Sequence, residues 1–85
     1  MNRIFSEAAW ADFMTWVYED RKIAKKINDL LLDIERHGHE GYGKLESLRH
    51  AFSGYWSRRI TQKDRLIYTF DGQNIYIAAC KGHYE

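Results

Sequence analysis

The sequence predicts a single α+β domain over residues 1–85, in which an N-terminal antiparallel helical hairpin packs on one face of a small, mostly antiparallel sheet of four to five strands. Two patterns carry this prediction. Apolar residues recur with helical spacing up to residue 37, and strand-like segments separated by turn residues occupy positions 55–80. The chain has no proline, no repeat and no linker, so one domain is expected.

The N-terminal part is predicted to form a short strand at residues 3–5 and then two helices. Ser6 is a suitable N-cap for the first helix, Asp20 for the second, and Gly38 is placed to end the second helix. The residues predicted to face the core are Trp10, Phe13, Met14 and Val17 in the first helix and Ile23, Ile27, Leu30, Leu31 and Ile34 in the second. The outer face of the second helix is predicted to be solvated and consists of Lys22, Lys25, Lys26, Asp29, Asp33 and Arg36.

The C-terminal part is predicted to form the sheet. Residues 38–54 are rich in glycine and break the helical period, with a short helical turn expected at 47–50. Strands are expected at 55–61, 65–70 and 74–80, and the Asp71-Gly72 pair is a strong turn signal between the last two. The last strand is almost continuously apolar, which predicts a central position in the sheet.

Composition indicates a packed domain of the cell interior. Apolar residues make up 45% of the chain and aromatic residues 15%, which is enough for a core. The single cysteine, Cys80, excludes an intramolecular disulfide and fits a reducing cytoplasm. No apolar run approaches the ~20 residues that a membrane-spanning helix needs, so no membrane association is expected.

The net charge of +1 conceals an asymmetry. Residues 1–40 carry a balance of −2, whereas residues 41–85 carry +3, most of it between Lys44 and Arg65. Within this basic stretch, alternation on a strand places Arg58 on one face and Arg59 on the other. Since guanidinium groups match phosphate oxygens in pairs, the pattern favours a nucleic-acid partner, with an ordinary solvated hairpin as the alternative.

Three titratable residues form a candidate metal-free site for cleaving RNA. Glu46 suits the general base that takes the 2′-hydroxyl proton, His83 the general acid that protonates the departing 5′-oxygen, and Arg65 the cation that stabilises the transition state. Tyr84 offers a ring for stacking a base. Lys44 and Arg49 extend the positive charge around the site. No cofactor is expected, because the chain has no phosphate-binding or dinucleotide-binding motif.

Each of these residues also has a structural interpretation. Glu46 can be an ordinary solvated loop residue, Arg65 can form a surface ion pair with Asp64, and His83 lies close to the C-terminal end. A metal site built from His37, His39 and His50, or from Cys80 and His83, is a weaker alternative, because a second ligand pair at the usual spacing is missing. Cys80 itself is predicted to be a buried structural thiol.

Three segments carry a resemblance to a known family. The motifs are Gly54-Tyr55-Trp56-Ser57-Arg58-Arg59-Ile60-Thr61, then Arg65-Leu66-Ile67-Tyr68, and finally Ala78-Ala79-Cys80-Lys81-Gly82-His83-Tyr84. Together with Ile4-Phe5-Ser6, Trp10 and Lys25-Lys26-Ile27-Asn28, they closely resemble the YoeB (Txe) toxins of the RelE superfamily over essentially the whole chain. The chain departs from the family pattern at Arg49, which is commonly lysine, and at Glu85, which follows the usual terminal His-Tyr pair.

The resemblance implies a toxin that enters the ribosomal A site and cuts messenger RNA. It assigns Glu46 as general base, His83 as general acid, Arg65 as transition-state stabiliser and Tyr84 as a substrate contact. Four basic residues would contact messenger or ribosomal RNA: Lys44, Arg49, Arg58 and Arg59. The resemblance further implies a homodimer, a YefM-like antitoxin and an operator-binding toxin–antitoxin complex. A catalytically silent RNA- or ribosome-binding module and a transcriptional co-repressor subunit remain the alternative functions.

Overall fold

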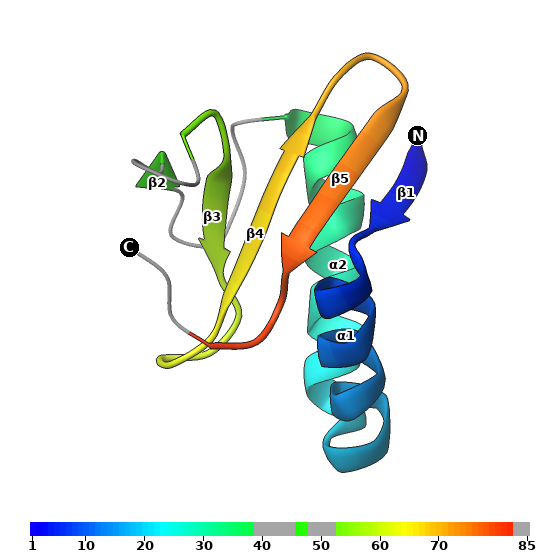
Figure 1. Ribbon diagram of the computed structural model, residues 1–85, viewed down its shortest axis with the longest axis vertical. Helices are drawn as coiled ribbons and strands as arrows, with labels where there is room; N and C mark the ends of the chain where they lie inside the picture. The colour runs from blue at the N-terminus through cyan, green and yellow to red at the C-terminus, as the bar shows by residue number, and fades with distance from the viewer. Residues whose placement is uncertain (39–45, 48–52, 83–85) are drawn as a thin grey trace.

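Two helices cover one face of a five-stranded sheet in the part of the chain that the structure describes (Figure 1). This structure is a computed structural model, and it describes residues 1–38, 46–47 and 53–82. The elements are β1 (Asn2–Phe5), α1 (Glu7–Glu19), α2 (Arg21–His37), β2 (Glu46–Ser47), β3 (Trp56–Arg59), β4 (Arg65–Phe70) and β5 (Asn74–Ala79). None of the described helices is both long enough and apolar enough to cross a bilayer.

The strand order is β1-β5-β4-β3-β2, with β1 parallel to β5 and every other neighbouring pair antiparallel. The predicted α+β class and the mostly antiparallel sheet are therefore confirmed. β5 is an interior strand, as its apolar sequence predicted, and it joins the N-terminal strand to the β3–β4 hairpin. The helical turn expected at 47–50 is wrong at Ser47, which belongs to β2, while residues 48–50 lie outside the described residues.

Helix α1 is fixed at its start by Ser6. The Ser6 hydroxyl accepts a hydrogen bond from the Ala9 amide at 3.0 Å and donates one to the Ala78 carbonyl oxygen at 2.9 Å, so the predicted cap also ties the helix to β5. The predicted core stripe is partly wrong, because Trp10 is 51% exposed and the buried tryptophan is Trp16. Trp10 instead packs edge-on against Phe5 at a centroid distance of 5.5 Å, at the rim of the core.

Helix α2 presents its predicted apolar stripe to the sheet. Asp20 caps its start by accepting from the Lys22 amide, and Gly38 ends it with a φ of 60°. Ile27, Leu30, Leu31 and Ile34 are all buried. One residue of the predicted solvated face is placed differently, because the Asp33 side chain is only 11% exposed and forms an ion pair with Arg58 of β3.

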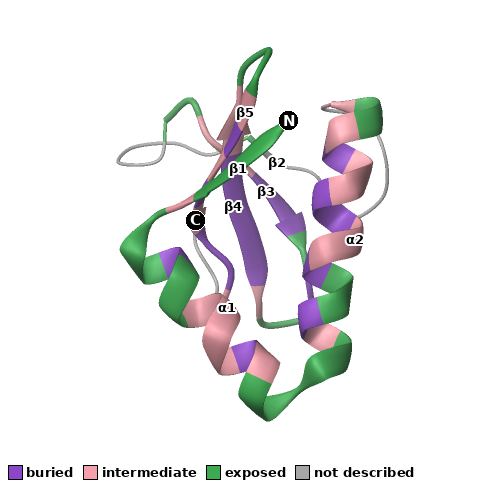
Figure 2. Cartoon of the chain, turned by 90° about the vertical axis from the view of Figure 1, so that its right-hand side faces the viewer, coloured by how far each residue is buried: buried purple, intermediate pink, exposed green. Residues whose placement is uncertain are grey.

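The two faces of the sheet differ in what covers them (Figure 2). The main core lies between the helices and the inward residues of the strands, which include Ile60, Leu66, Tyr68, Ile75 and Ile77. On the opposite face, Ile67 and Ala79 form a smaller apolar cluster against Tyr55 and Ala78. A register shift between Ile67 and Tyr68 lets β5 place Ala79 on this second face. The described residues of the candidate site lie on the same face of the sheet as that smaller cluster.

Candidate active site

Two arginines meet at the end of the β3–β4 hairpin, on the sheet face that points away from the helices. Arg59 of β3 and Arg65 of β4 are register partners, so their side chains leave the sheet on the same side. Leu66 faces the helices, and strand alternation therefore turns Arg65 toward the other face. Like charges directly opposite each other destabilise an antiparallel pair, so this position favours an anionic ligand between them.

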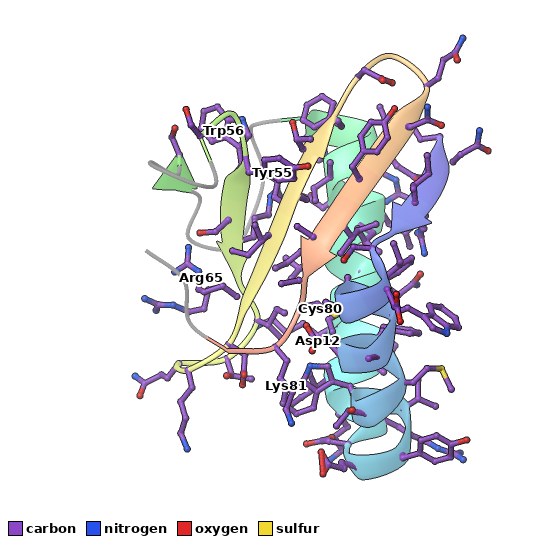
Figure 3. All side chains as sticks on the ribbon, viewed as in Figure 1. Asp12, Tyr55, Trp56, Arg65, Cys80 and Lys81 are labelled. Atoms are coloured by element: carbon purple, nitrogen blue, oxygen red, sulfur yellow. The ribbon has the colours of Figure 1, made fainter. Side chains whose placement is uncertain are left out.

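Arg65 is held by β3 and by the segment that follows β5. It is only 3% exposed, and its Nη2 donates to the Oγ of Ser57 at 2.8 Å (Figure 3). Ser57 is itself 1% exposed, so the contact is sheltered from water. The Arg65 amide donates to the carbonyl oxygen of Gly82 at 2.8 Å, which brings the segment after β5 against the start of β4. The guanidinium is thus fixed in direction before any ligand arrives, as electrostatic catalysis requires.

The alternative interpretation of Arg65, a surface ion pair with Asp64, does not hold, because these two described residues form no ion pair and Arg65 is only 3% exposed. Asp64 Oδ1 instead accepts from the Gly82 amide at 2.8 Å, and its Oδ2 accepts from the Thr61 hydroxyl at 2.6 Å. Sequence analysis missed Ser57 and Asp64 as supporting residues. Their short polar side chains beside arginines are a weak signal, and the contacts become visible only once the register of β3 and β4 is known.

Glu46, the predicted general base, lies in β2 opposite Ser57. The register therefore brings Glu46 to the strand position next to the Arg65–Ser57 contact. His83, Tyr84, Lys44 and Arg49 lie outside the described residues, and so do the histidines of the alternative metal site, His39 and His50. The described residues contain no group of three or more His, Cys, Asp and Glu that could hold a metal ion.

Arg58 contradicts its predicted role as an RNA contact, because the structure places it in the core. Its side chain is fully buried and donates to the Asp33 carboxylate, to the Gly38 carbonyl oxygen at 2.6 Å and to the Tyr68 hydroxyl at 3.1 Å. Burial disfavours the charged guanidinium, but the hydrogen bonds to Tyr68 and Asp33 outweigh it, and the pKa of Arg58 lies above its usual value. The sequence did contain a signal for this burial. Trp56 and Ile60, which share a strand face with Arg58, are both apolar.

Cys80 is confirmed as a buried thiol. It is completely inaccessible, and its Sγ lies 3.5 Å from the Ala9 carbonyl oxygen. Burial, together with the nearby Asp12 carboxylate, raises the pKa of the Cys80 thiol to about 12. A thiol with so high a pKa is a poor nucleophile at neutral pH.

We therefore expect the native protein to be inert toward Ellman's reagent at pH 8, since both burial and the raised pKa keep the Cys80 thiol out of reaction. The measurement is the absorbance of released thionitrobenzoate before and after addition of guanidinium chloride. One equivalent should appear only after unfolding. Rapid release from the folded protein would contradict the buried, protonated thiol.

One protein family matches nearly the whole chain. A family model described as YoeB-like toxin of bacterial type II toxin-antitoxin system matches residues 5–84. Toxin YoeB of Escherichia coli strain K12 is 48% identical over 84 residues, which cover 99% of this chain and 100% of that protein. This chain belongs to the YoeB-like toxin family. The resemblance seen in the sequence motifs is therefore confirmed.

Solved YoeB structures share the fold over its whole length. A YoeB dimer from Staphylococcus aureus superposes with a TM-score of 0.93 at 47% identity, covering 99% of this chain and 98% of that one. A heterotetrameric YoeB–YefM toxin–antitoxin complex from the same organism gives a TM-score of 0.91 over the same shares of the two chains. A toxin from Helicobacter pylori at 12% identity shares the fold alone, with a TM-score of 0.78.

Proposed function

We propose that this YoeB-like toxin is a ribosome-dependent endoribonuclease that cuts messenger RNA in the ribosomal A site of the bacterial cytoplasm and so inhibits translation. The observation that carries the proposal is the cross-strand pair of Arg59 and Arg65 on the sheet face that points away from the helices. Two guanidinium groups at one register position form a site for a phosphodiester, because each can donate paired hydrogen bonds to phosphate oxygens.

The proposed reaction divides the proton transfers between two residues outside the hairpin. Glu46 takes the proton of the 2′-hydroxyl, and the 2′-oxygen attacks the adjacent phosphorus. The bond from phosphorus to the 5′-oxygen breaks, and His83 donates a proton to that leaving oxygen. Arg65 stabilises the extra negative charge on the phosphorane-like transition state. The products are a 2′,3′-cyclic phosphate on the upstream fragment and a 5′-hydroxyl on the downstream fragment, and the step needs no metal ion.

The remaining residues are proposed to bind rather than react. Arg59 contacts the RNA backbone, together with Lys44 and Arg49, while Tyr84 stacks on a base. Arg58 is withdrawn from this set because it is buried. The proposed protein partners are a second copy of the chain and a YefM-like antitoxin, and only the toxin–antitoxin complex would bind operator DNA to regulate its own operon.

The chemistry of the product ends tests the proposed reaction. Incubation of the protein with messenger RNA on programmed ribosomes should give new ends in the A-site codon, whereas programmed ribosomes without the protein, the first control, should give none. The downstream fragment should be labelled by polynucleotide kinase without prior phosphatase treatment, because it carries a 5′-hydroxyl. RNA without ribosomes is the second control and should remain intact.

The other outcomes separate the alternative functions. Ends that carry a 5′-phosphate would contradict the proposed attack by the 2′-oxygen. Ribosome occupancy without new ends would identify a catalytically silent binding module. If the protein represses its operon in cells but cleaves RNA neither with nor without ribosomes, the result would favour a co-repressor subunit.

A further inference from the structure

The short segment that follows β5 is held by side chains from two distant parts of the fold. Helix α1 holds Cys80, whose amide donates to Asp12 Oδ2 at 3.0 Å and whose carbonyl oxygen accepts from Trp16 Nε1 at 2.8 Å. Figure 3 shows Asp12 and Cys80 side by side where α1 passes the end of β5. The polar backbone groups of Cys80 are therefore both satisfied by one helix.

The β3–β4 hairpin likewise forms hydrogen bonds with both the amide and the carbonyl oxygen of Gly82. The Gly82 amide donates to Asp64 Oδ1 at 2.8 Å, and its carbonyl oxygen accepts from the Arg65 amide at 2.8 Å. Gly82 adopts a φ of 95°, a conformation that glycine adopts without strain and other residues rarely do. The backbone is thus turned sharply and fixed on both sides at the residue that immediately precedes His83 in the sequence.

Asp64 is itself oriented by its own turn. Its Oδ2 accepts from the Thr61 hydroxyl at 2.6 Å, and that hydroxyl accepts from the amides of Lys63 at 3.1 Å and Asp64 at 3.0 Å. The Ile60 amide closes the turn on the Asp64 carbonyl oxygen at 2.9 Å. The Thr61 contact with Oδ2 therefore restricts the rotamer of Asp64 from within its own turn, and the Gly82 amide supplies the donor to Oδ1.

We propose that Asp64 is a positioning residue that sets the direction in which the chain leaves Gly82, and so constrains the backbone that leads into the proposed general acid His83. Together with Asp12 and Trp16 it forms a C-terminal anchor, defined as the three side chains that hold the backbone of Cys80 and Gly82. This inference rests on the function proposed above. A proton donor must be held within hydrogen-bond reach of its leaving group.

The size of the effect follows from the geometry of catalysis. A misplacement of about 1 Å remote from the chemistry can cost roughly 10²-fold in rate. We therefore expect Asp64→Ala to lower the single-turnover cleavage rate at saturating toxin by about 10–100-fold. The toxin concentration that gives half-maximal rate should remain unchanged, because the anchor is not proposed to touch RNA. Asp64→Asn keeps an oxygen acceptor for the Gly82 amide and should recover most of the lost rate.

The matched control is Asp71→Ala. Asp71 lies in the β4–β5 turn and also accepts from two backbone amides, those of Gln73 and Asn74, each at 2.8 Å, but it has no contact with Gly82 among the hydrogen bonds of the described residues. If the loss of any turn aspartate lowered the cleavage rate, Asp64→Ala and Asp71→Ala would be slowed equally. Melting temperatures for all variants show whether each protein is folded at the assay temperature.

A double-mutant cycle with His83→Ala decides whether Asp64 acts through His83. If it does, Asp64→Ala lowers the rate in the wild-type background and has no further effect on the residual cleavage of His83→Ala. An equal loss in both backgrounds, or a full rate for Asp64→Ala alone, overturns the positioning role while the proposed function stands. A full rate for His83→Ala overturns the acid role on which both proposals depend.

Discussion

Replacing Arg58 by alanine is expected to lower the free energy of unfolding by about 3–5 kcal/mol, because it removes the buried guanidinium that pairs with the Asp33 carboxylate. The Asp33 side chain is only 11% exposed, and Arg58 is the residue that links it to Tyr68 of β4 and to the end of α2 at Gly38. A small domain has a total stability of about 5–15 kcal/mol, so this one change removes a large part of it. The measurement is the midpoint of urea denaturation followed by tryptophan fluorescence.

The neighbouring arginine provides the matched control. Arg59 is exposed on the opposite face of the same strand, and Arg59→Ala should change the stability by no more than about 0.5 kcal/mol. A paired replacement, Arg58→Met with Asp33→Leu, removes both buried charges and should restore most of the stability lost in Arg58→Ala. Equal midpoints for Arg58→Ala and Arg59→Ala would contradict the core position of Arg58.

Replacing Arg65 by lysine is expected to lower the single-turnover cleavage rate by roughly 10²–10³-fold while leaving the fold intact. Lysine keeps the positive charge but has no planar fork, so it cannot hold Ser57 Oγ and a phosphate oxygen with donors fixed in one plane. The Arg65 amide contact with Gly82 belongs to the backbone and survives the change. The rate constant is measured on programmed ribosomes with toxin in excess over messenger RNA.

Arg59→Lys is the control for charge and position, because Arg59 is the register partner of Arg65. We expect this variant to raise the toxin concentration needed for half-maximal cleavage and to leave the maximal rate almost unchanged, as a phosphate-positioning contact should. If both lysine variants lower the maximal rate equally, Arg65 has no special role in the transition state.

The parts of the fold that depend on local rules could be predicted from the sequence. Ser6 and Asp20 are short polar residues directly before an amphipathic period, and they cap the two helices as expected. The strands around the Asp71-Gly72 turn were also found within a residue or two of their observed ends. In each case the determining interactions lie within a few residues of one another in the chain.

The features that depend on distant contacts could not be predicted in the same way. Strand alternation shows that Arg58 and Arg59 point to opposite faces, but it does not show which face the helices cover. The partner that makes burial of Arg58 tolerable, Asp33, is 25 residues away on another element. The burial of Trp16 also depends on a distant contact, because its indole donates to the Cys80 carbonyl oxygen, 64 residues away in the sequence. Trp10 is equally apolar but remains at the surface.

The parallel pairing of β1 with β5 has a consequence for how the protein is made. Asn2 pairs with Asn74 and Phe5 with Ile77, so more than 60 residues separate β1 from the strand beside which it lies. Contacts between such distant residues form late in folding, because a long loop must close first. The sheet that carries Arg65 therefore becomes complete only after β5 has been synthesised, and β1 remains without its described strand neighbour until then.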